Sequence, residues 1–225
     1  MKILKAYWVL IIFITGCSLS TKETVRQVQY NIFYDTPLSP VQLQEVSTKY
    51  RYIPLETNDY SLLEDITDPI MYKNNRYYID NQLCIFMFDC NGKYLKTFDR
   101  HGQGPGEYGL YFFSTVNDKG DIVLLTGGSR NIYYYTSEGD FISKINLDSL
   151  HTDGMAFLND TLLLLQEAEM RDGYKYHVLN LSSSQIQNTF YPMKDRKHCS
   201  WRDDCFTSYD GKILVSEYKS KIGRA

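Results

Sequence analysis

Three glycines fall within five residues in the segment 100–108, RHGQGPGEY, a composition that can serve phosphate chemistry. Clustered glycines direct backbone N–H groups at a phosphate when a Lys-Ser/Thr pair and a helix N-terminus follow them. Neither follows this segment, so phosphate binding is disfavoured. We expect a sharp connection between strands, in which Pro105 stiffens the turn and the glycines take unusual φ angles. The residues of this predicted connection are Gly102, Gln103, Gly104, Pro105, Gly106, Glu107 and Tyr108.

Four cysteines beyond residue 17 raise the question of disulfides. Cys84 and Cys90 stand six residues apart on one predicted strand, which separates them by roughly 20 Å in an extended chain. They therefore cannot bridge each other. Cys199 and Cys205 flank the sequence SWRDD in a predicted loop, and they could form a disulfide in an oxidising compartment.

The same loop offers ligands for a metal ion, because His198 lies beside the two cysteines and Asp203 or Asp204 lies between them. The spacing matches no strong zinc signature. We therefore predict no metal here. The other histidines are scattered, and no G-x-S-x-G nucleophile motif is present. The sequence predicts no catalytic residue and no organic cofactor.

Carboxylates near predicted strand ends could line a channel and hold Ca²⁺. They are Asp65, Asp68, Asp80 and Glu107. Aspartates at such positions more often accept hydrogen bonds in turns and caps, and we expect that role here.

Two aromatic runs, Tyr111-Phe112-Phe113 and Tyr133-Tyr134-Tyr135, could stack against carbohydrate. Alternation along a strand places half of each run on each face of a sheet. Because stacked sheets bury both faces, core packing is the expected role, with carbohydrate stacking as the alternative.

The elements that would position these residues follow a repeat. Three segments, 84–98, 131–145 and 174–186, each read as strand, turn and strand, and their turns at Gly92, Gly139 and Ser183 stand 47 and 44 residues apart. Asn91-Gly92 predicts a two-residue hairpin. A further hairpin precedes each segment, with turns at Asn74-Asn75, Lys119-Gly120 and Asn159-Asp160, and a fourth falls at Asp210-Gly211. About four strands in each 40–50 residues is the period of a β-propeller blade.

The composition agrees with an all-β protein. The 225 residues include 43% hydrophobic and 15% aromatic residues, which excludes a disordered chain. The formal net charge of −3 argues against nucleic-acid binding, which would call for a basic excess.

The N-terminus has the composition of an export signal. Two lysines precede an apolar run of about nine residues, too short for a bilayer, which needs about 20. The following Gly16-Cys17 resembles the lipobox of bacterial lipoproteins, which implies that Cys17 is lipidated and begins the mature chain; an ordinary cleaved signal or an anchoring helix is the alternative. We expect a lipoprotein signal peptide over residues 1–16, a tether over 17–46 and a partial β-propeller domain over 47–225.

Several motifs resemble the NHL repeat and the six-bladed β-propeller lipoproteins of Bacteroidota. They are GQGPGEY at 102–108, YIPLET at 52–57, LEDI at 63–66 and the segments around 78–80 and 85–93. The resemblance implies an all-β propeller of four-stranded blades at the cell envelope, anchored by lipid. Ser18 follows the cysteine in place of Asp, which favours the outer membrane, on its periplasmic face or at the cell surface. The resemblance conveys fold and location better than chemistry.

Counting blades leaves the chain short of that fold. About three and a half blades are present, whereas six need roughly 270 residues beyond the leader and tether. We therefore expect a C-terminally truncated propeller with open sheet edges, prone to aggregation, in which Lys49–Leu55 supplies a strand to the last blade.

The leading hypothesis is a lipid-anchored, non-catalytic module that binds a protein or glycan partner and no nucleic acid. A propeller hydrolase or lactonase with a channel metal is the alternative, and a non-functional truncated fragment is the third possibility.

Overall fold

The computed structural model describes residues 49, 51–63, 66, 69–126, 128, 130–148, 150–167, 173–192, 205–209 and 212–216. The chain divides into two compact units, Met1–Tyr50 and Arg51–Ala225, and the described residues after 49 all belong to the second. The predicted signal peptide, Cys17 and nearly all of the tether lie outside the described residues.

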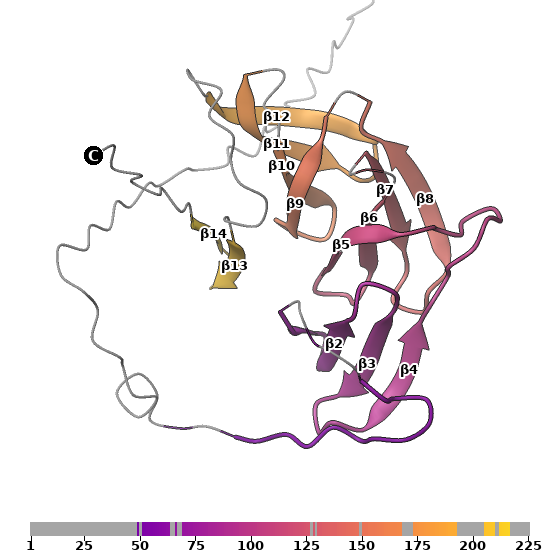
Figure 1. Cartoon of the computed structure of the whole chain (residues 1–225). Helices are drawn as coiled ribbons and strands as arrows, with labels where there is room; N and C mark the ends of the chain where they lie inside the picture. The colour runs from indigo at the N-terminus through magenta and orange to yellow at the C-terminus, as the bar shows by residue number, and fades with distance from the viewer. Residues whose placement is uncertain are drawn as a thin grey trace, which may run out of the picture. The chain divides into compact units, whose positions relative to one another are not determined.

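Every regular element among the described residues is a β-strand, as the alternating pattern predicted. Three successive groups of four strands form three antiparallel sheets, and two further strands form a hairpin (Figure 1). Within each sheet the spatial order follows the chain order. The strands are β1 (Met71–Lys73), β2 (Arg76–Asp80), β3 (Ile85–Asp89), β4 (Tyr94–Phe98), β5 (Tyr111–Val116), β6 (Ile122–Thr126), β7 (Asn131–Tyr135), β8 (Phe141–Asn146), β9 (Thr152–Phe157), β10 (Leu162–Glu167), β11 (Tyr174–Asn180), β12 (Gln185–Pro192), β13 (Cys205–Tyr209) and β14 (Lys212–Ser216).

The hairpin between β3 and β4 is longer than the sequence predicted. Gly92 donates its N–H to the carbonyl of Asp89 at 3.0 Å, and Asp89 pairs with Lys93 at 2.8 Å, which leaves three residues in the loop. Gly92 has a φ of +85°, whereas Asn91 does not take a positive φ. The carboxylate of Asp89 accepts the N–H groups of Asn91 and Lys93 at 2.8 and 2.9 Å, and these bonds favour the three-residue turn over the two-residue one.

Consecutive sheets pack through their first strands and through an apolar core. Strand β1 contacts β5, β5 contacts β9, and β9 contacts β13. Between the first two sheets lies a buried cluster of ten side chains, and each contributes about 1.5–3 kcal/mol by burial. Its members are Tyr78, Ile85, Met87, Phe98, Tyr108, Tyr111, Val116, Ile122, Leu124 and Tyr135. A second buried cluster joins the second and third sheets.

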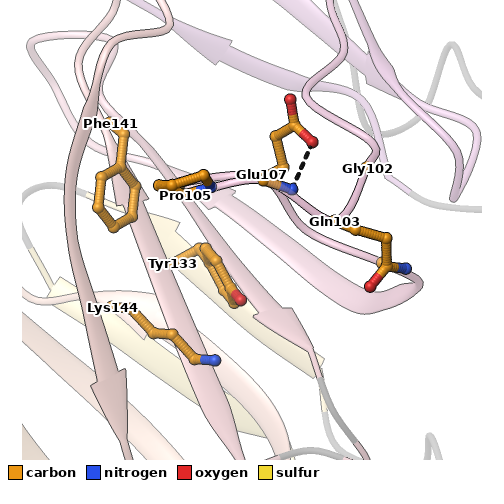
Figure 2. A pocket seen from close by; sticks show the side chains of 10 residues that line it. Gly102, Gln103, Pro105, Glu107, Tyr133, Phe141 and Lys144 are labelled. Atoms are coloured by element: carbon orange, nitrogen blue, oxygen red, sulfur yellow. Dashed lines mark hydrogen bonds between the residues drawn. The ribbon is translucent and has the colours of Figure 1, made fainter.

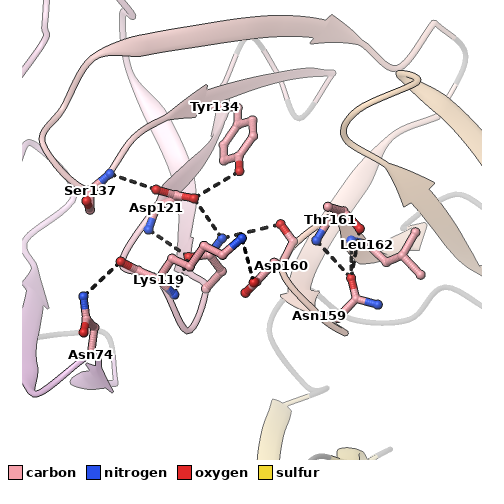
Figure 3. A network of polar contacts seen from close by, with 10 residues as sticks. Asn74, Lys119, Asp121, Tyr134, Ser137, Asn159, Asp160, Thr161 and Leu162 are labelled. Carbon is pink, nitrogen blue, oxygen red and sulfur yellow. Dashed lines mark hydrogen bonds and ion pairs between the residues drawn. The ribbon is translucent and has the colours of Figure 1, made fainter.

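The turns that follow β1, β5 and β9 are joined by polar contacts (Figure 3). Asn74 donates its side-chain N–H to the carbonyl of Lys119 at 3.0 Å. The ammonium of Lys119 lies 3.0 Å from Asp160, and this pair raises the pKa of Lys119. Inside the middle turn, the buried side chain of Asn117 accepts the N–H groups of Lys119 and Asp121 at 3.0 and 2.8 Å. These contacts link the three successive repeats at one end of the sheets.

The buried carboxylate of Asp80, at the end of β2, joins the first sheet to the second. It accepts the hydroxyl of Tyr111 at 2.7 Å and the hydroxyl of Ser114, both on β5. It also accepts the N–H of Gln82 at 2.6 Å. Burial raises the pKa of Tyr111, and the negative charge of Asp80 raises it further by a smaller amount. Asp80 therefore has the hydrogen-bonding role expected of it, while Asp65 and Asp68 lie outside the described residues.

The strand expected over Lys49–Leu55 is absent from residues 51–55, and this expectation was wrong for them. The segment instead binds the turn between β3 and β4. Glu56 donates its N–H to the carbonyl of Gly92 at 2.8 Å and accepts the N–H of Tyr94 at 3.0 Å. Arg51 donates to the carbonyl of Cys90 at 3.2 Å. The backbone and side chain of Glu56 thus bond to a turn and its flanking residue, rather than forming a strand ladder.

Candidate functional site

The predicted connection 102–108 lies between β4 and β5 and links the first sheet to the second. The N–H of Glu107 donates to the carbonyl of Gly104 at 3.1 Å, which closes a four-residue turn. Pro105 and Gly106 are its central residues, and Gly106 has a φ of +74°. Proline followed by a residue with positive φ is the signature of a type II turn.

The carboxylate of Glu107 folds back over this turn. Its Oε2 atom accepts the N–H of Gly104 at 2.7 Å. A Cβ atom at Gly102 would collide with this carboxylate, and one at Gly104 would lie 3.0 Å from it. The glycines at these two positions therefore make room for a glutamate side chain of the same loop.

Tyr108 anchors the C-terminal end of the loop. Its side chain is buried, and its ring centroid lies 6.1 Å from that of Phe98, 5.4 Å from that of Tyr111 and 6.3 Å from that of Tyr135. Burial raises the pKa of Tyr108 to about 12. The aromatic packing fixes the loop between the two sheets.

A hollow of about 440 Å³, open on one side, lies between this loop and strands β7 and β8 of the second sheet (Figure 2). Its lining combines loop backbone with aromatic and charged side chains. The lining residues are Gly102, Gln103, Gly104, Pro105, Gly106, Glu107, Gly109, Tyr133, Phe141 and Lys144.

Strands β7 and β8 bring three of these side chains together. Tyr133 pairs in register with Lys144, and the Lys144 Nζ atom lies 5.1 Å from the centroid of the Tyr133 ring. The ring of Phe141 lies 6.2 Å from that of Tyr133, centroid to centroid, and its side chain is 44% exposed. The result is a partly exposed aromatic surface with an ammonium group beside it.

Two contacts hold the loop against the second sheet. The hydroxyl of the buried Tyr135 donates to the carbonyl of Gly106 at 3.0 Å. The guanidinium of Arg100 donates to the carbonyl of Gly139 at 3.1 Å. A Cβ atom at Gly106 would lie 2.6 Å from Cγ of Phe141, so the loop packs directly on the aromatic wall of the hollow.

Only some rings of the aromatic runs have the core-packing role expected of them. Tyr111 and Tyr135 are buried in the core, as packing predicted. Phe112 is 47% exposed on β5, and Tyr133 lines the hollow. Sequence reasoning did not join Tyr133 to Phe141 and Lys144; pairing the strands across the Gly139 turn is the signal that would have done so.

Among the described residues, the other candidate side chains do not line this hollow. Cys84 and Cys90 are unbridged and partly buried, and burial raises the pKa of Cys84 to about 11. His198 and Cys199 lie outside the described residues, and only the backbone of Cys205 is described. The Cys199–Cys205 disulfide therefore stays a prediction. Within the described residues, no three His, Cys, Asp or Glu side chains are placed to hold a metal ion.

Four-stranded antiparallel sheets in series, with their first strands in contact, define a β-propeller-like all-β protein. The chain belongs to the family DUF4934, a domain of unknown function, whose model matches residues 29–222. No curated protein matches the chain. In the part of the chain that the structure describes, no helix has the length and apolar character needed to cross a membrane.

Solved structures resemble this fold at low sequence identity. One is a Bacteroides fragilis protein that is named an exported protein by inference. It is 18% identical in sequence, the match covers 74% of this chain and 54% of that protein's chain, and the TM-score is 0.55. The chain thus spans about half the length of that protein. A DUF4221 family protein from Bacteroides vulgatus is 15% identical over 77% of this chain and 62% of its own, with a TM-score of 0.44. The WD40 β-propeller domain of Doa1 is 8% identical in sequence. The match covers 66% of this chain and 52% of that chain, and the TM-score is also 0.44.

Proposed function

We propose that this protein is a lipid-anchored β-propeller module of the cell envelope that binds a protein or glycan partner without catalysing a reaction. The observation that carries the proposal is the hollow beside the connection 102–108. It places the exposed side chains of Phe141 and Lys144 beside the partly buried ring of Tyr133, on a scaffold of packed sheets. Concave sites with aromatic walls and a few polar groups are the usual form of ligand sites.

The hollow is formed by groups that are already fixed. The type II turn, the Glu107 carboxylate and the hydroxyl of Tyr135 hold the loop in one conformation. A preformed site loses less conformational entropy on binding, which favours affinity. The polar side chains of the lining are the ammonium of Lys144, the amide of Gln103 and the carboxylate of Glu107, which already accepts an N–H of the loop. Groups of this kind can bind a ligand through hydrogen bonds and charge.

The sheet series supports a partial six-bladed propeller of about three and a half blades, with two strands of the fourth blade in β13 and β14. The lipobox-like sequence ending in Cys17 supports attachment through acyl chains, which anchor stably when more than one is present. The name of the Bacteroides fragilis structure, an exported protein, is consistent with an envelope location, and we propose that the protein is anchored in the outer membrane.

Two measurements on the full chain in its native cells test the proposal. The wild-type protein should fractionate with membranes and carry a metabolically incorporated acyl label, whereas Cys17→Ala should lose the label and leave the membrane fraction. A photo-crosslinking residue in place of the exposed Gln103 should give an adduct, and one in place of Asp118, in the turn after β5, should not. Membrane retention of an unlabelled Cys17→Ala protein, or equal adducts at both positions, would contradict it.

A further inference from the structure

We infer that the hollow binds a glycan chain that carries an acidic sugar, with the sugar ring on Tyr133 and Phe141 and its carboxylate at Lys144. This inference rests on the proposed binding function and names the chemical class of its ligand. The hollow has about 440 Å³, within the range of small-ligand sites, and is partly open to solvent, so a glycan chain can extend out of it.

The aromatic wall provides the first part of the recognition. An aromatic ring is electron-rich on its face, and the C–H groups on one face of a sugar ring carry a small positive charge. Tyr133 and Phe141 have centroids 6.2 Å apart and planes inclined at 54°, so together they form a bent apolar surface. Phe141 is 44% exposed, which leaves ring surface available for contact.

The charge at Lys144 provides the second part. The ammonium groups of Lys73, Lys96 and Lys119 each contact a carboxylate, at 2.7, 2.8 and 3.0 Å. Lys144 is also exposed, yet among the described residues it contacts only the ring of Tyr133, at 5.1 Å from the centroid. An ammonium that no carboxylate of the described residues neutralises, next to the partly buried ring of Tyr133, fits a ligand that offers both a ring face and an anion.

The loop supplies hydrogen-bonding groups for sugar hydroxyls. Gln103 is exposed on the rim of the hollow and can both donate to and accept from sugar hydroxyls. The carboxylate of Glu107 accepts the N–H of Gly104 at 2.7 Å and would repel an anion, so the sugar carboxylate lies at Lys144 and Glu107 is left to accept from sugar hydroxyls.

A peptide partner would use this region differently. Strand β8 is the outer strand of its sheet, and an extended peptide would pair with its backbone edge. Tyr133 and Lys144 are a cross-strand pair, and their side chains share one face of the sheet rather than lying along its edge. The groups that make the hollow distinctive are therefore placed for a ligand lying on the face, as a sugar ring does.

The test uses the purified full chain in detergent, applied to an array of oligosaccharides that includes uronate-containing and matched neutral glycans. Hits are then titrated by calorimetry. We expect binding to uronate-containing glycans, with affinity reduced about tenfold or more by Lys144→Gln and by Phe141→Ala. Phe112→Ala and Lys93→Gln are the matched controls, since they remove an equally exposed ring and an exposed lysine outside the hollow, and both should bind as the wild type does.

Three outcomes would overturn the inference: no uronate-containing glycan bound, equal affinity for the neutral counterparts, or binding that survives Lys144→Gln and Phe141→Ala together. Binding of a peptide from a parallel peptide array that these two variants abolish would assign the hollow to a protein partner instead. In each of these cases the proposed envelope function still stands if Cys17→Ala leaves the membrane and Gln103 yields its adduct. If those cellular tests fail while the array succeeds, the proposed function fails and the glycan site stands.

Discussion

The Oε2 atom of Glu107 accepts the backbone N–H of Gly104 at 2.7 Å, so the glutamate of GQGPGEY is bonded to a glycine three residues before it. Its carboxylate also occupies the space where a side chain at Gly102 would lie. This relationship explains a glycine-rich motif without a phosphate: two glycines accommodate the glutamate, and a third supplies the positive φ of the turn. The motif shapes one wall of the hollow.

Gly102→Ala should lower the free energy of unfolding by about 1 kcal/mol, because the new methyl displaces the Glu107 carboxylate from the Gly104 N–H. Gly109→Ala is the matched control, since nothing lies within 4 Å of its Cβ position. Urea unfolding measures both. In a protein that already carries Glu107→Ala, Gly102→Ala should lower the free energy of unfolding by almost nothing further. An undiminished cost in that background would show that Glu107 is not the obstacle.

Gly106→Ala should be more destabilising than Gly128→Ala. Both positions have positive φ, +74° and +66°, so alanine is strained by about 1–2 kcal/mol at each. Only at Gly106 would the added Cβ meet a side chain, at 2.6 Å from Cγ of Phe141, whereas nothing lies within 4 Å at Gly128. Urea midpoints that fall equally in the two variants would exclude this packing of the loop on Phe141.

Asn117→Ala should lower the free energy of unfolding by about 1–3 kcal/mol, because two N–H groups of its turn lose their acceptor. The adjacent Asp118→Ala should change it by less than about 1 kcal/mol. Asp118 contacts Lys73 at 2.7 Å, but its side chain is 80% exposed, and exposed ion pairs stabilise little. Thermal unfolding of the two variants checks the order, and a reversed order would contradict the role given to this turn.

The protein should lose stability above about pH 10. Burial raises the pKa of Tyr108 and Tyr134 to about 12, and for Tyr134 the nearby Asp121 adds to the shift. Folding therefore favours the neutral phenols. Their contribution is complete below the pKa of unfolded tyrosine, about 10, and is lost as the pH rises toward 12.

Urea midpoints between pH 8 and 11 measure this effect, with tyrosinate absorbance as a second readout. Tyr134→Phe should flatten the fall in stability above pH 10, since it removes one of the shifted groups. A midpoint that stays constant to pH 11 would be incompatible with the raised pKa values of Tyr108 and Tyr134.

Much of the fold followed from local sequence. The alternation of apolar and polar residues and the Asn/Asp-Gly turns predicted the hairpins. Both signals are local, because a strand shows a two-residue period in its own side chains and a hairpin turn needs residues that tolerate a positive φ. Asn74 and Asn75 take φ values of +50° and +56°, as a two-residue hairpin turn requires. The turn at Gly92 came out one residue longer, because the carboxylate of Asp89 bonds the loop N–H groups.

The hollow could not be predicted in the same way. It depends on the loop 102–107 folding back onto β7 and β8, and on the register that sets Tyr133 opposite Lys144. The contacts of the loop join residues about 30 to 40 positions apart, which no local pattern encodes, whereas the Tyr133–Lys144 pair lies within one hairpin. The Lys49–Leu55 segment failed as a strand for a related reason: local pattern marked it extended, but its described part bonds to a turn.

Photo-crosslinking at the hollow tests the central claim most directly. Benzoylphenylalanine in place of Tyr133, in the full chain expressed in its native cells, inserts into C–H bonds of a sugar or a peptide and so reports any occupant. We expect an adduct at Tyr133 and none with the same residue in place of Phe112, a ring on β5 that lies outside the hollow and is more exposed than Tyr133. No adduct at Tyr133, or adducts of equal yield at both positions, would contradict a binding module that uses this hollow.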